Sequence, residues 1–256
     1  MLGAMIGDIV GSVYEWHNIK TTEFELFKED CFFTDDTVLT AATAKSLISE
    51  VNYTEVYQDF SQRFPRRGYG GNFSAWIYAE FPKPYNSWGN GSAMRVSPVG
   101  FAFDTVDKVL EEAKQSAIVT HNHPEGIKGA QSTALAVLMA RQGASQADIR
   151  AEITRRFDYD LDRTLDEIRP DYTFDVSCQG SVPEAIIAFL ESESFEDAIR
   201  KAISLGGDSD TIACITGGIA EAFYGGVPDE IASKGQSYLP EEFIQILEDF
   251  QNWRER

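Results

Sequence analysis

The sequence predicts a predominantly α-helical fold, and three observations support this prediction. Apolar residues recur at the 3.6-residue spacing of amphipathic helices in several segments. Capping residues precede several of these segments. Only one short segment, 172–176, alternates apolar and polar residues as a strand would, and the regular alternation of strands with helices that marks a parallel sheet is missing.

The first clear helix is expected over 36–48, where the apolar side chains fall near one face. The Ala- and Leu-rich segment 130–140 predicts an apolar helix packed at the centre of the fold. Ser145, followed three residues later by Asp148, predicts the N-cap of another helix.

Three further helix starts are predicted in the second half of the chain. Pro183 precedes an apolar run and suits the first position of a helix. Ser194 with Asp197 repeats the pattern of an N-cap hydroxyl and an acid three residues later. Pro240 precedes the last amphipathic segment of the chain. We therefore expect helices joined by long functional loops.

Composition indicates one globular domain over residues 1–256. The chain is 43% hydrophobic, which suffices for a sizeable core. Its formal net charge of −19 disfavours partners with a phosphate backbone and anionic membrane surfaces. No apolar run approaches the ~20 residues of a membrane-spanning helix. We expect a monomer that binds neither nucleic acid nor membrane.

Cysteine usage and the first residues predict a cytoplasmic protein. Residues 1–8 carry no basic segment and reach an acid at once, unlike a secretory signal. Cys31, Cys178 and Cys214 are widely spaced and include no pair with zinc-ligand spacing. Neither a disulfide framework nor a zinc site is supported, which fits a reducing compartment.

Two acidic clusters are the strongest candidates for chemistry. Each opens a predicted helix: one at 33–37, the other at 206–211. Capping explains each cluster taken singly, because Asp, Ser and Thr accept bonds from the free N–H groups of a first turn. A cap needs only one carboxylate, however, and neighbouring carboxylates repel each other unless a positive charge separates them.

The ligand types in both clusters favour Mg²⁺ or Mn²⁺ over zinc, because all the donors are oxygens. Two cations ~3.5–4 Å apart could polarise a substrate and activate water. An EF-hand calcium loop is excluded, because Ala213 and Ile219 occupy the sixth and twelfth positions, where that loop requires Gly and Glu. A haloacid-dehalogenase-type phosphatase, whose Asp-x-Asp-x-Thr-like signature ends a buried strand, remains the alternative enzyme.

Two glycine-bearing loops, 68–71 and 87–95, could hold phosphates through backbone N–H groups. The second also offers Trp88 near a base or ribose, and the positive charge of Arg95. The alternative is that the second loop is only a turn. His121 and His123 precede Pro124, where either could touch a ligand.

Together these motifs resemble the ADP-ribosylglycohydrolase family. The resemblance runs in order through GDIVGSVYE at 7–15, TDDT at 34–37, GYG at 68–70, GNGSAMR at 89–95 and GGDSDTIA at 206–213. It also includes residues 120–121, 217–218 and 224–225 and so covers nearly the whole chain. It implies an all-α orthogonal helical bundle with a two-metal cleft.

The resemblance also implies roles for individual residues. The two cations, Mg²⁺ or Mn²⁺, would be held by Thr34, Asp35, Asp36, Asp208, Asp210 and Thr211, with Asp210 as the bridge. Glu15 matches a glutamate that gates the site and contacts metal or substrate. The diphosphate and ribose of ADP-ribose would contact Ser87, Gly89, Asn90, Gly91 and His121, beside Trp88.

The function that the resemblance implies is hydrolysis of the glycosidic bond at C1″ of ADP-ribose attached to a protein side chain or another acceptor. Asp35 or Asp36 would help to activate water, and Glu15 would place the substrate or act as acid or base. The alternative from a different class is a module that binds ADP-ribose without cleaving it. All the implied ligands are present, which favours catalysis.

Overall fold

The protein is described by a computed structural model that covers residues 1–255. This part of the chain folds into fifteen α-helices and contains no strand. The helices are α1 (Leu2–Gly11), α2 (Asp35–Ser49), α3 (Tyr53–Arg63), α4 (Gly71–Ile77), α5 (Gly91–Met94), α6 (Ser97–Ala102), α7 (Val106–Ile118), α8 (Pro124–Arg141), α9 (Gln146–Phe157), α10 (Leu165–Ile168), α11 (Cys178–Leu190), α12 (Phe195–Ser204), α13 (Ser209–Phe223), α14 (Asp229–Gln236) and α15 (Glu241–Arg254).

The predicted all-α class is confirmed, and most of the predicted helix starts are correct. The Ser145 side chain accepts from Asp148 N in a full capping box, and Ser194 accepts from Asp197 N in the same way. Pro240 is the residue that precedes the first turn of α15. Segment 172–176 forms no strand, and an isolated bridge pairs Gly89 with Ser177.

The prediction that a helix begins at Pro183 is wrong. Helix α11 begins five residues earlier, at Cys178, because the Ser177 hydroxyl accepts from Gly180 N at 3.0 Å and caps the first turn. Pro183 lies inside the helix. It has no N–H to donate to the carbonyl four residues before it, and its ring crowds that carbonyl, so α11 continues past Pro183 without one hydrogen bond of its ladder.

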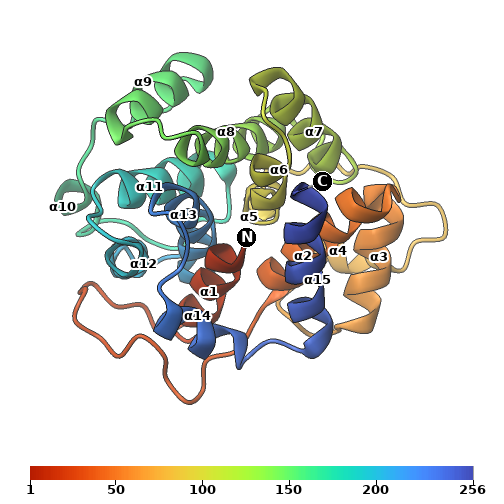
Figure 1. Ribbon diagram of the computed structural model, residues 1–256, viewed down its shortest axis with the longest axis horizontal. Helices are drawn as coiled ribbons and strands as arrows, with labels where there is room; N and C mark the ends of the chain where they lie inside the picture. The colour runs from red at the N-terminus through yellow and green to blue at the C-terminus, as the bar shows by residue number, and fades with distance from the viewer. Residues whose placement is uncertain (256) are drawn as a thin grey trace.

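The core is centred on helices from opposite ends of the chain. In Figure 1, α1 and α13 lie side by side near the middle of the molecule, with α8 to α12 on one side and α2 to α4 with α15 on the other. Within the second group, the buried side chain of Phe243 on α15 packs against Phe64, with ring centroids 4.7 Å apart. No helix in residues 1–255 has the length and apolar character needed to span a membrane.

Helices α1 and α13 touch through their backbones. Gly3, Gly7 and Gly11 are spaced four apart and share one face of α1. A Cβ on Gly7 would lie 2.0 Å from the carbonyl oxygen of Ala213, and one on Gly11 would lie 2.5 Å from Asp210 Cα. Only glycine permits this approach. It brings the C-terminal end of α1 against the first turn of α13.

We predict that Gly7→Ala lowers the free energy of unfolding by about 3 kcal/mol, because the new methyl group meets rigid backbone. Urea denaturation followed by circular dichroism measures the change. Gly71→Ala is the matched control, since a Cβ there meets nothing within 4 Å and the backbone angle is ordinary. Equal unfolding midpoints for the two variants would contradict the helix contact described here.

Candidate active site

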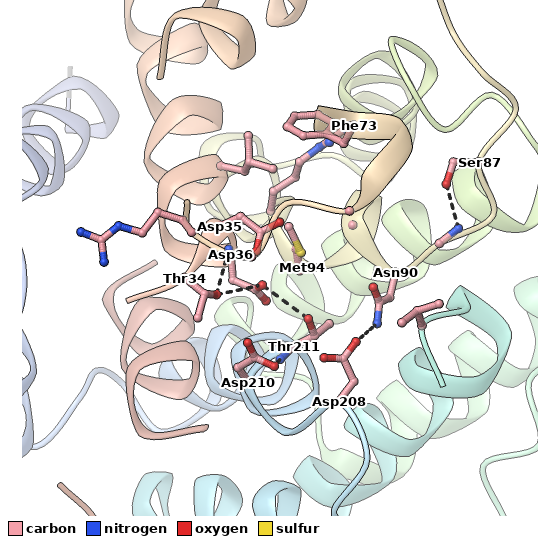
Figure 2. Close-up of a pocket in the computed structure, with 18 of the residues that line it drawn as sticks. Thr34, Asp35, Asp36, Phe73, Ser87, Asn90, Met94, Asp208, Asp210 and Thr211 are labelled. Atoms are coloured by element: carbon pink, nitrogen blue, oxygen red, sulfur yellow. Dashed lines mark hydrogen bonds between the residues drawn. The ribbon is translucent and has the colours of Figure 1, made fainter. Parts of the chain in front are cut away.

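A cleft of about 800 Å³ brings the two acidic motifs together. Figure 2 shows Thr34, Asp35 and Asp36 at the start of α2 facing Asp208, Asp210 and Thr211 at the start of α13. The Thr211 hydroxyl lies 3.4 Å from Asp36 Oδ2, although the two residues are 175 positions apart in sequence. The starts of these two helices therefore form one acidic surface.

The carboxylates of this surface form an acidic cluster, which we define by its members. They are Asp8, Glu15, Asp35, Asp36, Asp208 and Asp210. Oxygens of Asp8, Asp36 and Asp210 lie within 4.8 Å of one another, and so do oxygens of Glu15, Asp208 and Asp210. Asp210 belongs to both groups. Asp35 belongs to neither; it is half-buried and lines the cleft.

Asp8 is the member that the sequence analysis did not single out. It lies on α1 and is fully buried. Its Oδ2 accepts from the backbone N–H groups of Thr34 and Thr37 at 2.9 and 3.0 Å. Its Oδ1 accepts from the Thr34 hydroxyl at 2.7 Å. The sequence signal that could have identified Asp8 is its position as the single carboxylate in an otherwise apolar helix.

The contacts of Asp8 define the orientation of the Thr34 hydroxyl. Because its proton goes to Asp8, the Thr34 oxygen keeps its lone pairs for other partners. One of them accepts from Asp36 N at 3.3 Å, so Thr34 does cap α2. Capping and a ligand role are thus compatible at this residue. Asp8 positions Thr34 and the first turn of α2, and three of its acceptor sites are used in doing so.

Capping does not account for Asp208. It occupies the N-cap position of α13, but its side chain makes no capping hydrogen bond. Its Oδ2 instead accepts from Asn90 Nδ2 at 2.7 Å, a contact drawn in Figure 2. The carboxylate is therefore turned away from its own helix and into the cleft.

Hydrogen bonds of the exposed Asn18 side chain hold Glu15 next to the start of α13. The Asn18 amide donates to the carbonyls of Tyr14, Glu15 and Gly207, and its oxygen accepts from Gly207 N at 2.8 Å. Gly206 and Gly207 have φ angles of 71° and 69°, which favour glycine. Asn18 thus ties the segment after α1 to the turn before α13. Sequence reasoning missed this residue, because its partner is 189 positions away.

No cationic side chain forms an ion pair with the acidic cluster within the described residues, although Arg66, Arg67 and Arg95 line the same cleft. Burial, followed by repulsion from neighbouring carboxylates, raises the pKa of Asp35 and Asp36 well above the ordinary value. Burial, then Asp210, raises the pKa of Glu15 to about 7. Burial also raises the pKa of Asp208 to about 6.

These features suit hard divalent cations. The donors are carboxylate and hydroxyl oxygens, the type that Mg²⁺ and Mn²⁺ prefer. Asp36 Oδ1 is buried without a hydrogen-bond partner, although buried carboxylate oxygens normally have one. A cation would supply the missing partner and the missing positive charge together.

The other half of the cleft is lined by the glycine-bearing loops. Ser87, Trp88, Gly89, Asn90, Gly91 and His121 all line it. The Asn90 amide already donates to Asp208 and to the Ser181 hydroxyl, so its N–H groups are used within the protein. The loop at 68–71 also borders the cleft, where a Cβ on Gly68 would lie 3.0 Å from Asp35 Oδ1.

Exposed aromatic side chains border the cleft. Trp16, next to Glu15, stacks on Phe174 with ring centroids 5.2 Å apart. Trp88 on the glycine loop is 47% exposed. These rings could cover the face of a base or of an acceptor group.

Comparisons with known proteins identify one family of similar proteins. The family model described as ADP-ribosylglycohydrolase matches residues 1–255. The chain is 28% identical to ADP-ribosylhydrolase ARH3 of Mus musculus, over 98% of this chain and 87% of that protein. It is 25% identical to ADP-ribosylarginine hydrolase Tri1 of Pseudomonas putida, over 91% and 72% of the two chains. A solved structure titled "ADP-ribosylglycohydrolase-related protein complex" matches with a TM-score of 0.74 at 25% identity, covering 99% of this chain and 96% of that one.

We predict that the metal-free protein loses stability as the pH rises from about 4 to 8. The folded-state pKa values, about 6 for Asp208 and about 7 for Glu15, exceed the values in the unfolded chain. The folded state therefore holds these protons more tightly than the unfolded state, and the stability that this provides is complete below pH 4 and is lost as the two groups ionise. The loss should be roughly 1–3 kcal/mol, after a discount for the exposure of Glu15. Thermal unfolding in chelator across this pH range measures it, and Mg²⁺ or Mn²⁺ at pH 8 should restore the stability. A profile that rises with pH would contradict the repulsion argument.

We further predict that Asp210→Asn flattens this pH profile while it weakens Mn²⁺ binding at least about tenfold, since it removes a charge shared by both groups of carboxylates. Calorimetric titration with Mn²⁺ and the same thermal scans give both quantities. Asp30→Asn, an exposed acid outside the cleft, is the matched control and should change neither. If Asp210→Asn bound Mn²⁺ as tightly as the control variant, the shared-ligand role would be wrong.

Proposed function

Because this chain belongs to the ADP-ribosylglycohydrolase family, we propose that it is a metal-dependent hydrolase that cleaves the glycosidic bond at C1″ of ADP-ribose attached to a protein side chain or another acceptor. The observation that carries the proposal is the acidic cluster, gathered in one cleft where no ion pair within residues 1–255 neutralises it. The relatives named above carry the activity in their names, as ADP-ribosylhydrolases. The cleft volume also suits a ligand of this size.

Two divalent cations would be held by the hydroxyls and carboxylates at the starts of α2 and α13. The proposed ligands are Thr34, Asp35, Asp36, Asp208, Asp210 and Thr211, with Glu15 beside them. When bound, such cations supply Lewis-acid polarisation and lower the pKa of bound water. Asp210 suits a bridging position, because it is the residue shared by the two groups of carboxylates.

The remaining chemistry is assigned to residues of the chain. In the hydrolysis, the oxygen of water bonds to C1″, the bond from C1″ to the acceptor breaks, and a proton reaches the leaving group. Asp35 is half-buried and lines the cleft, so one of its oxygens can accept the proton of the attacking water. Asp36 is 2% exposed, which favours a ligand role for it. Glu15 is half-buried at the cleft, where it can place the substrate and exchange a proton with it.

We predict that the protein releases free ADP-ribose and unmodified acceptor from at least one substrate in a panel of arginine-linked, serine-linked and ribose–ribose-linked ADP-ribosyl compounds. Mass spectrometry of the products identifies the linkage. Asp35→Asn and Asp36→Asn should each lower turnover at least about a hundredfold, because each removes a carboxylate from the reacting cleft. Asp30→Asn should keep full activity.

Two outcomes would contradict this proposal. Tight Mn²⁺ and ADP-ribose binding with every ADP-ribosyl linkage left intact would favour a non-catalytic binding module. Release of inorganic phosphate from simple phosphoesters would favour a phosphatase.

We also predict that Gly91→Val raises the dissociation constant for ADP-ribose about tenfold or more. A Cβ on Gly91 would lie 3.2 Å from His121 Nε2, so the larger side chain fills the place where the diphosphate would approach the loop. Calorimetry with ADP-ribose measures the change, and Mn²⁺ affinity serves as the internal control because the acidic cluster is untouched. His121→Ala should weaken ADP-ribose binding less, as it removes one donor among several. An unchanged affinity for ADP-ribose in a folded Gly91→Val variant would show that the loop has only a structural role.

A further inference from the structure

A chain of buried polar groups lies beneath the glycine loop of the cleft. Arg95 is fully buried, and no ion pair in the described part of the chain includes it. Its Nη2 donates to the Ser116 carbonyl at 2.9 Å and to the Thr120 hydroxyl oxygen at 3.0 Å. Thr120 is also fully buried, and its hydroxyl lies 2.7 Å from His121 Nδ1. The three side chains thus run from the core to the cleft.

The direction of each hydrogen bond in this chain follows from the chemistry of its members. A guanidinium only donates, so the Thr120 oxygen must accept from Arg95. A buried hydroxyl also needs an acceptor for its own proton. Within residues 1–255, His121 Nδ1 is the remaining hydrogen-bond partner of that hydroxyl. The proton of Thr120 therefore points to Nδ1, which must carry a lone pair.

His121 is held neutral in the same environment. Burial, followed by the charge of Arg95, lowers the pKa of His121 well below its ordinary value. A neutral imidazole with a lone pair on Nδ1 carries its proton on Nε2. Nε2 faces the glycine loop, since it would lie 3.2 Å from a Cβ on Gly91 and 3.6 Å from a Cβ on Gly89.

We propose that Arg95 and Thr120 are positioning residues that fix His121 in the Nε2–H form, so that the cleft presents a neutral hydrogen-bond donor to an anionic oxygen of the substrate. The identity of that oxygen, a diphosphate oxygen of ADP-ribose, rests on the proposed function. The protonation of His121 does not.

The opposite tautomer would be unfavourable for such a ligand. It would turn the Nε2 lone pair toward a phosphate oxygen, in a protein whose net charge is already −19. It would also leave the proton of Thr120 without an acceptor in a buried position. Arg95 thus acts on the ligand indirectly, through the orientation of one hydroxyl group.

The tautomer can be measured directly, because the chain has only three histidines. Long-range ¹H–¹⁵N correlation spectra of histidine-labelled protein distinguish the two forms, and His17→Gln with His123→Gln leaves His121 as the single signal. We expect the Nε2–H form in this background and in Thr120→Ser. Thr120→Val, which keeps the shape and removes the hydroxyl, should populate the Nδ1–H form. Arg95→Met should shift the population in the same direction.

An Nδ1–H pattern in the Thr120-containing protein would overturn the proposal, and that result does not depend on whether the Thr120 and Arg95 variants fold. An unchanged Nε2–H pattern in a folded Thr120→Val variant would overturn it as well. With ADP-ribose as the probe, Thr120→Val should bind about fivefold to tenfold more weakly, and Thr120→Ser should bind normally, with Mn²⁺ affinity equal in both. If the unsubstituted protein failed to bind ADP-ribose, the proposed function would fail while the spectra still decided the tautomer.

Discussion

The structure depends on keeping a cluster of carboxylates together in a cleft, where no ion pair within residues 1–255 neutralises them. Burial and mutual repulsion both oppose ionisation of these carboxylates, as the raised pKa values of Asp36 and Asp210 show. The fold resists this repulsion through the backbone contact of α1 with α13, where Gly7 meets Ala213. Since no side chain separates the two helices, their ends cannot move apart without breaking the centre of the core. The rigidity of the core thus maintains an arrangement of carboxylates that repel one another, which bound cations would relieve.

Within the cluster, hydrogen bonding separates carboxylates that support the site from those left free to bind. Asp8 accepts three hydrogen bonds from Thr34 and Thr37. These bonds favour its ionised form, although burial still raises its pKa. Asp36 on α2 keeps a buried oxygen, Oδ1, that has no hydrogen-bond partner. The same acidic residue type therefore serves two purposes a few ångströms apart. The difference lies in which N–H and O–H groups surround each carboxylate.

The features that the sequence predicts are those set by neighbours along the chain. The capping box at Ser145 and the helix after Thr34 depend on residues three or four positions away, which a pattern can register. The sequence analysis missed Asp8 and Asn18 because their hydrogen-bond partners lie 26 and 189 positions away in the chain. Pro183 was misplaced because a cap at Ser177, itself unremarkable in sequence, moved the helix start. The acidic motifs were visible in the sequence pattern, whereas their meeting in one cleft was implied only by the family resemblance, because no local pattern relates residues 175 positions apart.

The carboxylates gather at one end of the cleft and His121 lies at the other, and this asymmetry bears on how a substrate would lie in it. His121 is neutral, and Arg95 lies buried behind it without a counter-charge. A buried cation acts at longer range than an exposed one, because little water screens it. In the proposed function, a diphosphate would therefore be favoured at the glycine loop, and the distal ribose would reach the acidic cluster. Net charge alone would repel ADP-ribose, so its orientation has to come from this local asymmetry.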